Sequence, residues 1–220
     1  MSPVIDGVKF EIHRGDVIGL IGQSGVGKTT FLDLVCGFIQ PTDGEINHKF
    51  GKMKPHDPAF AYLTANPAIL SGSLEENVAF SDDLAPDELK RIHRILRDVG
   101  LSETVNEMSD GLDTDLGQSG SRLSAGQKQR LGIARAIFHR PRFLILDEAT
   151  NANDEETEKV IFEGLRRRLP NVATIVVSHR QSTLRFCNSV FVMTAGKLHP
   201  VVDLDQYFYL ANENDSETSD

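Results

Sequence analysis

The clearest chemistry in the sequence lies in a glycine-rich run, Gly22-Gln-Ser-Gly25-Val-Gly27-Lys28-Thr29. Its spacing is that of the phosphate-binding P-loop, or Walker A motif. Glycines let backbone N–H groups turn toward phosphate, and a helix that follows directs the positive end of its dipole at the anion. Lys28 can reach the β- and γ-phosphates, and the Thr29 hydroxyl can bind Mg²⁺. The pattern predicts nucleotide binding by Gly22, Gln23, Ser24, Gly25, Val26, Gly27, Lys28, Thr29 and Thr30.

A glycine turn that only joins a strand to a helix would be a simpler interpretation of this run. The flanking sequence favours phosphate binding, because an apolar strand is expected over residues 16–21 and a helix over residues 29–37. That strand–loop–helix order is the context that the motif requires.

Polar residues with catalytic potential follow two other apolar runs. Asp147 and Glu148 follow residues 143–146, and His179 follows residues 174–177. Asp147 can hold Mg²⁺ directly or through water, and Glu148 can accept a proton from an attacking water. Such pairs often only cap helices, but ligands of open α/β sheets bind at the carboxyl ends of the strands. Together with a P-loop, we interpret Asp147 as a metal ligand, Glu148 as a general base and His179 as a γ-phosphate contact.

The elements that must position these residues alternate between strands and helices. Strands are expected over residues 8–12, 16–21, 60–63, 143–146 and 174–177, with a final hairpin over 189–193 and 196–201. Residues 66–140 are expected to form a mainly helical lobe, with one helix near residues 89–99 and another from Ser124 to about His139. The predicted fold class is α/β, a P-loop NTPase with a mainly parallel sheet and an inserted helical lobe. We predict one domain over residues 1–211 and an acidic, disordered tail over residues 212–220.

Composition narrows the classes of partner. The net charge of -9 disfavours broad nucleic-acid binding. Cys36 and Cys187 lack metal-type spacing and are interpreted as reduced core thiols. The sequence has neither an apolar run of about 20 residues nor a recognisable signal peptide, so work at a membrane would require a membrane-spanning partner.

A further set of motifs makes the sequence resemble a known family. Leu123-Ser-Ala-Gly-Gln127 is similar to the signature of ATP-binding-cassette (ABC) proteins, Asn151-Ala-Asn-Asp154 stands at the D-loop, and Ser178-His-Arg180 resembles the H-switch. Two more segments, 72–77 and 114–120, resemble the exporter branch. The sequence therefore resembles the nucleotide-binding domain of an ABC exporter over nearly its whole length.

The resemblance implies a function and several partners. It implies ATP hydrolysis powering transport, with ATP and Mg²⁺ as cofactors and Lys28, Glu148 and His179 as catalytic residues. Ser124, Gly126 and Gln127 would contact ATP held by a second cassette, in a homodimer or a heterodimer. A transmembrane domain would hold the cassette at the cytoplasmic face of a membrane.

Two departures from the family pattern leave alternatives open. Ala65 stands where the family's Q-loop glutamine is expected, and Asn66 could replace it only in a shifted register. The aromatic that stacks on adenine is expected upstream of residue 8, and Phe10 is too close to the P-loop to be that residue. A cassette that binds ATP and dimerises but hydrolyses little is one alternative. A soluble ABC ATPase acting on DNA or ribosomes is the other, but the coiled coils or second cassette of those proteins are not seen.

Overall fold

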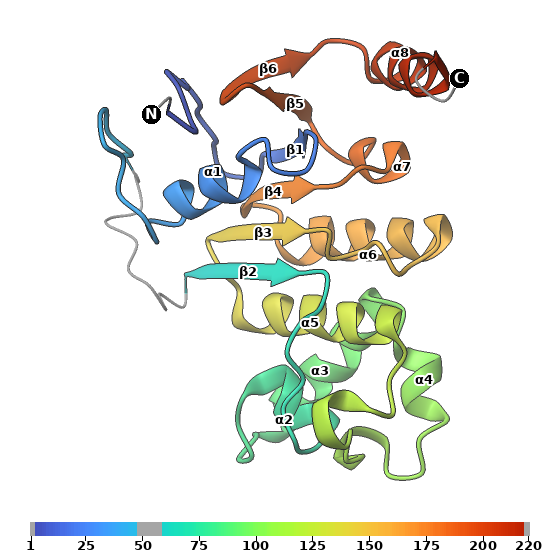
Figure 1. Cartoon of the computed structure of the whole chain (residues 1–220). Helices are drawn as coiled ribbons and strands as arrows, with labels where there is room; N and C mark the ends of the chain where they lie inside the picture. The colour runs from blue at the N-terminus through green and yellow to red at the C-terminus, as the bar shows by residue number, and fades with distance from the viewer. Residues whose placement is uncertain (1–2, 48–58, 218–220) are drawn as a thin grey trace.

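A computed structural model describes residues 3–47 and 59–217. A six-stranded sheet forms its centre, in the order β2-β3-β4-β1-β5-β6. All neighbours pair in parallel except β5 and β6, which form an antiparallel hairpin, so the mainly parallel sheet predicted from the sequence is confirmed. The strands are β1 Val17–Ile21, β2 Phe60–Thr64, β3 Phe143–Asp147, β4 Ala173–Val177, β5 Ser189–Thr194 and β6 Lys197–Val201 (Figure 1).

Helices cover both faces of this sheet. In the described part of the chain they are α1 Lys28–Val35, α2 Leu74–Ala79, α3 Pro86–Asp98, α4 Ser102–Asn106, α5 Ala125–His139, α6 Glu155–Arg168, α7 Gln181–Leu184 and α8 Leu204–Glu217. Short 3₁₀ turns lie at Gly111–Asp113 and Gln118–Gly120. No helix among the described residues is long and apolar enough to span a bilayer.

The alternation of side chains along β3 and β4 divides the core into two layers. Leu144, Leu146 and Val176 face a cluster built with α3, α5 and α6. Ile145 and Val177 face a second cluster that includes Phe31 and Leu32 of α1. Both strands are buried along nearly their whole length, as expected for parallel strands covered on both faces. The helix that carries the P-loop therefore packs on the face opposite α5 and α6.

Residues 66–140, expected to be mainly helical, contain α2, α3, α4, both 3₁₀ turns and α5. The two helices predicted from apolar spacing are confirmed. Pro86 opens α3, and Ile92, Ile95 and Leu96 bury its apolar face. α5 packs against α2, α3, α6 and the edge strand β2, so this lobe continues the sheet sideways beyond β2 (Figure 1).

Two sequence-based expectations are wrong. Residues 8–12 form no strand, although Val8, Phe10 and Ile12 are half-buried against the core and Lys9 and Glu11 are exposed. The alternation therefore determines burial without determining strand pairing, because pairing also requires a neighbouring strand.

The second correction concerns the expected disordered tail from Asn212. α8 continues to Glu217, so residues 212–217 are helical, and residues 218–220 lie outside the described part. The helix is anchored near its start, where Leu204, Tyr207 and Phe208 pack against the core cluster of Ile21, Leu184 and Val190. A helix that is nucleated by packing propagates at low cost into polar residues.

The lobe is joined to the sheet through a close contact between α3 and α6. Asp98 ends α3 with a buried side chain that accepts hydrogen bonds from Arg167 at 2.6 Å and Arg168 at 2.5 Å. Gly164 of α6 lies directly against the backbone carbonyl of Asp98, leaving no room for a Cβ.

We predict that Gly164→Ala lowers the free energy of unfolding by about 1–3 kcal/mol, because the added methyl would overlap the Asp98 carbonyl. Urea denaturation measures the change. The matched control is Glu163→Ala, whose side chain is exposed on the same helix and whose effect should stay within about 0.5 kcal/mol. Equal stability of the two variants would contradict the close packing of α3 on α6.

Candidate nucleotide-binding site

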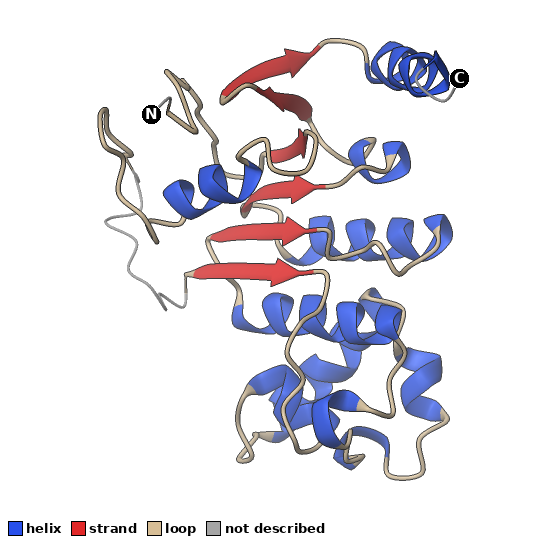
Figure 2. Ribbon diagram, viewed as in Figure 1, coloured by secondary structure: helices blue, strands red, loops and turns tan. Residues whose placement is uncertain are grey.

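Three neighbouring strands bring the predicted site residues to one edge of the sheet. β3, β4 and β1 are adjacent and parallel, so their carboxyl ends lie together (Figure 2). β1 leads into the P-loop, β3 ends at Asp147 and β4 leads to His179. The register aligns Asp147 and Leu20 with the same β4 residue, Val177. Residues separated by more than 120 positions in the sequence therefore converge.

The P-loop has the backbone geometry that a phosphate cradle requires. Gly25 and Gly27 have φ values of 77° and 109°, in the region that favours glycine. Gly27 is also the N-cap of α1 and has no side chain to occupy the first-turn amides of that helix. Those amides and the helix dipole together form an anion site.

Lys28 closes the loop on itself. Its Nζ donates hydrogen bonds to the carbonyls of Gly22 at 2.5 Å and Gln23 at 2.9 Å. The ammonium group is thus held above the loop amides, where a phosphate would meet both the charge and the backbone donors.

The carboxylates at the end of β3 occupy different environments. Asp147 accepts a hydrogen bond from the Tyr62 hydroxyl at 2.8 Å, and burial together with this bond raises the pKa of Tyr62 well above its usual value. Glu148 has a φ of 54°, a conformation that non-glycine residues seldom adopt and that often marks functional sites. Its backbone N–H donates to the Val177 carbonyl at 3.0 Å.

Glu148 and His179 approach each other across the ends of β3 and β4. His179 Nε2 lies 3.6 Å from Glu148 Oε1, and Asn151 Nδ2 donates to Glu148 Oε2 at 3.2 Å. Both side chains are accessible, with exposed fractions of 39% for Glu148 and 52% for His179. The pair is therefore open to a water or phosphate at this edge of the sheet.

The signature residues do not join this group. Ser124 caps α5 by accepting from the Gln127 N–H at 3.2 Å, and Gln127 accepts from the Ser124 N–H at 2.8 Å. α5 lies beside β2, three strand positions from β1, and on the face opposite α1. At about 4.8 Å per strand, the sheet alone separates them by roughly 14 Å. Within one chain, Ser124, Gly126 and Gln127 are therefore apart from the P-loop.

Gly126 instead contacts the D-loop. A Cβ at this position would lie 2.8 Å from the Ala152 carbonyl oxygen and 3.1 Å from Asn153 Oδ1. The neighbouring Gln129, which is buried, accepts from the Ala152 N–H and from Asn153 Nδ2, both at 3.0 Å. The start of α5 and the D-loop thus form one packed unit.

Ala65 follows Thr64, which pairs in register with Asp147. The predicted Q-loop position therefore lies beside the acidic end of β3. Its methyl group makes no polar contact, but its carbonyl accepts a hydrogen bond from Gln129 Nε2 at 2.9 Å. Gln129 consequently links the segment after β2 to the D-loop.

Sequence reasoning missed two polar residues of this region, Tyr62 and Gln129. Tyr62 could have been suspected, because it lies two residues before the end of its strand and shares a face with Thr64. Gln129 resembles any polar residue of an amphipathic helix, and only the fold shows that it is buried.

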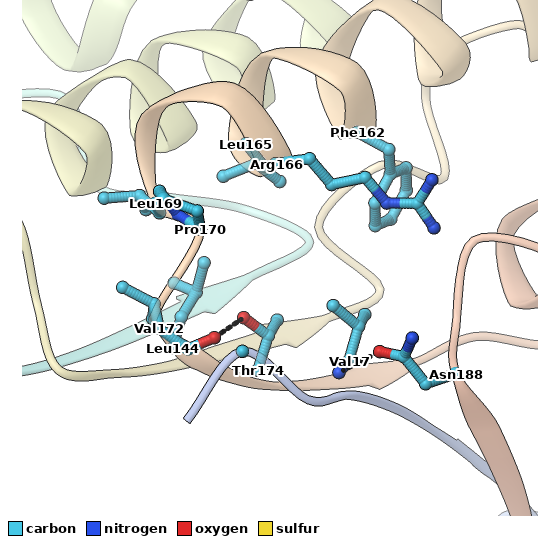
Figure 3. Close-up of a pocket in the computed structure, with 11 residues that line it drawn as sticks. Val17, Leu144, Phe162, Leu165, Arg166, Leu169, Pro170, Val172, Thr174 and Asn188 are labelled. Atoms are coloured by element: carbon cyan, nitrogen blue, oxygen red, sulfur yellow. Dashed lines mark hydrogen bonds between the residues drawn. The ribbon is translucent and has the colours of Figure 1, made fainter. Parts of the chain in front are cut away.

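One cavity among the described residues lies away from this edge of the sheet. It has a volume of about 470 Å³ and lies between α6 and the amino-terminal halves of β1 and β4 (Figure 3). Apolar residues dominate it, and the polar atoms of Arg166 and Asn188 beside it already bond to backbone groups. The P-loop, by contrast, is an open surface of backbone donors at the other end of β1.

Comparison with known proteins identifies the family. A sequence model described as "ABC transporter" matches residues 5–151. The chain belongs to the ABC transporter family. It is 37% identical over 201 residues to an ATP-dependent lipid A-core flippase of Burkholderia orbicola, covering 89% of this chain and 33% of the flippase. It is 36% identical over 200 residues to ABC transporter B family member 21 of Arabidopsis thaliana, covering 89% of this chain and 15% of the relative.

A solved structure shares the fold of this ABC cassette. It is titled as a bacterial Atm1-family ABC exporter with ATP bound, with a TM-score of 0.78 and 28% identity over 89% of this chain and 35% of that chain. The cassette therefore spans about a third or less of the two relatives and the solved structure. The family resemblance found from the motifs is confirmed, and membership in this family implies ATP binding.

We predict that Gly126→Ala loosens the contact between α5 and the D-loop, since the new methyl would crowd the Ala152 carbonyl. The expected loss of stability is about 1–3 kcal/mol, measured by urea denaturation. Ala125→Ser, at the exposed preceding position, is the control and should change stability little. A fully stable Gly126→Ala protein would argue against this packing.

Proposed function

We propose that this chain is the ATP-hydrolysing nucleotide-binding domain of an ABC exporter. The observation that carries the proposal is the convergence of Lys28, Asp147, Glu148 and His179 at the carboxyl ends of β1, β3 and β4. Gly22, Gln23, Ser24, Gly25, Val26, Gly27, Lys28, Thr29 and Thr30 cradle the phosphates, and Lys28 exchanges its loop carbonyls for phosphate oxygens.

The residues at this edge fit a magnesium ion. The Thr29 hydroxyl and the Asp147 carboxylate are hard oxygen donors, the kind that Mg²⁺ prefers. Among the described residues there is no cluster of three or more His, Cys, Asp or Glu side chains that could hold a metal alone. Mg²⁺ usually takes one or two protein ligands and completes its shell with phosphate and water, so Thr29 and Asp147 would be enough protein ligands for it. Bound there, Mg²⁺ would neutralise charge on the β- and γ-phosphates.

Glu148 is the residue best placed to accept a proton from the attacking water. Its carboxylate is accessible, and Asn151 and His179 approach its two oxygens. His179 stands next to the same position and contacts the γ-phosphate. A correctly placed general base contributes roughly 10²–10⁴-fold to such a rate.

The site is completed by a second cassette. Ser124, Gly126 and Gln127 start α5, whose positive dipole end is an anion site with no phosphate loop of its own chain beside it. In a head-to-tail pair, this helix start meets the γ-phosphate held by the P-loop of the partner. A transmembrane domain of an exporter, on this or another chain, holds the pair at the cytoplasmic face of a membrane.

A second candidate is a cassette that binds ATP and dimerises but hydrolyses slowly. Ala65 favours it, because a methyl group beside Asp147 can neither coordinate a metal nor orient water. The two candidates share nucleotide binding and differ only in turnover.

We predict that Lys28→Ala lowers ATP affinity on the order of 100-fold, because it removes the cation held over the loop amides. Isothermal titration calorimetry with Mg·ATP measures the affinity. Lys9→Ala, an exposed lysine outside the loop, is the control and should bind as the wild type does. Unchanged affinity in Lys28→Ala would overturn the assignment of the loop.

We also predict that Glu148→Gln traps ATP in a stable dimer, since the amide keeps the shape of the side chain but cannot accept the proton. Light scattering should give twice the monomer mass with Mg·ATP and the monomer mass without it. Adding Ser124→Ala and Gly126→Ala should abolish that dimer while ATP binding persists. A protein that stays monomeric at high concentration with Mg·ATP would contradict the composite site.

A further inference from the structure

A buried carboxylate lies just behind the proposed site. Glu158 is in the first turn of α6, and its side chain is fully buried. It takes no part in the chemistry proposed above. A carboxylate is strongly hydrated in water, so burial is costly unless protein groups replace that hydration. The partners of Glu158 therefore indicate what its burial achieves.

The partners come from two loops. Thr150, two residues after Glu148, donates its hydroxyl to Glu158 Oε1 at 2.7 Å. Thr183, four residues after His179, donates to the same oxygen at 2.8 Å. Ser182 donates to Oε2 at 3.3 Å. Both threonines are themselves buried, with exposed fractions of 3% for Thr150 and 0% for Thr183.

Arg180 ties the same two loops together. Its Nη1 lies 3.3 Å from Glu158 Oε1 and donates to the Asn153 carbonyl of the D-loop at 2.6 Å. Charge-assisted bonds of this kind are stronger and more directional than neutral ones. Within the described part of the chain, the partners of the Glu158 carboxylate thus lie in the segment after Glu148 and in the segment after His179, not in its own helix.

We propose that Glu158 is a positioning residue that fixes His179 relative to Glu148. The inference rests on the proposed hydrolysis. Glu158 does not reach the nucleotide; it acts through Thr150 on one loop and through Thr183 and Arg180 on the other. Glu148 and His179 stand 3.6 Å apart on separate loops, and their distance is set by whatever joins those loops. Catalytic groups need placement to within about 0.5 Å, and a misplacement of about 1 Å can cost about 100-fold in rate.

The geometry distinguishes a positional role from a role of charge. In Glu158→Gln, the amide oxygen can occupy the place of Oε1 and still accept from Thr150 and Thr183, while the NH₂ group can donate to the Ser182 hydroxyl. Glu158→Ala removes both connections. Glu163→Ala, exposed on the same helix, is the control.

We expect Glu158→Ala to lower kcat for ATP hydrolysis about 10- to 100-fold while KM and the calorimetric affinity for ATP change less than about threefold. Glu158→Gln should retain most of the wild-type kcat, and Glu163→Ala all of it. Rates are compared at protein concentrations where turnover per chain has reached its plateau, so that weaker pairing is not mistaken for slower chemistry.

A second measurement needs no hydrolysis. Hydrogen–deuterium exchange of the protein without nucleotide should speed up in residues 148–154 and 178–184 of Glu158→Ala, and in neither segment of Glu158→Gln. Should Glu158→Ala fail to fold, Thr150→Val and Thr183→Val each cut one connection. Each should then lower kcat, and the double variant should lose little more than either single one, because both act on one distance.

The outcomes separate this inference from the proposed function. An unchanged kcat in Glu158→Ala, a loss confined to KM, or additive threonine variants would overturn the positioning role. A wild type that binds ATP without hydrolysing it would defeat the proposed hydrolysis, and exchange would still decide whether Glu158 joins the two loops. Unchanged exchange in Glu158→Ala would show that Glu158 does not join the two loops, whether or not the wild type hydrolyses ATP.

Discussion

Parallel pairing of β3, β4 and β1 is the constraint on which the rest of the structure depends. Parallel strands deliver their carboxyl ends to one edge, so strand pairing alone brings three distant segments to that edge. Strand alternation then places α1 on one face and α5 and α6 on the other. The helical lobe attaches beyond β2 and is held to α6 by Asp98 and Gly164. The P-loop and the start of α5 are therefore separate parts of one scaffold.

Behind this edge, hydrogen bonds between polar groups join the segments that follow the strands. Gln129 joins the segment after β2 to the D-loop, and Arg180 joins the D-loop to the segment after β4. These bonds are partly buried, so water competes with them less than with hydrogen bonds on the open surface. Ala65 enters this network through its backbone carbonyl only, which any residue would supply. Its side chain is thus free to differ from glutamine without disturbing the local fold.

The sequence alone predicted most of the frame, because phosphate loops and buried parallel strands leave local patterns. The P-loop, the strand before Asp147 and the capped helix from Ser124 each depend on residues close in sequence. Contacts such as Tyr62 with Asp147, 85 positions apart, have no such signature. The burial of Glu158 left a weak local pattern. This residue precedes Ile161 and Leu165 by three and seven residues and so lies on the apolar face of α6. The alternation at residues 8–12 wrongly predicted a strand, because strand pairing depends on a neighbouring strand. The acidic residues after 211 wrongly predicted disorder, because α8 is extended from a start that packs on the core.

The distance between the start of α5 and the P-loop determines how much the pairing of two cassettes depends on their being tethered to each other. In the proposed head-to-tail pair, a chain that cannot bring its own Ser124 to its own P-loop would depend on the effective concentration of a second copy. A short flexible connection can set that concentration near the millimolar range, well above the bulk value for two free chains. The same pair of surfaces would then be mostly apart when the cassettes diffuse freely and mostly joined when both are anchored to one scaffold. Changes in anchor spacing could control occupancy of the joined state without altering any residue at the edge of the sheet.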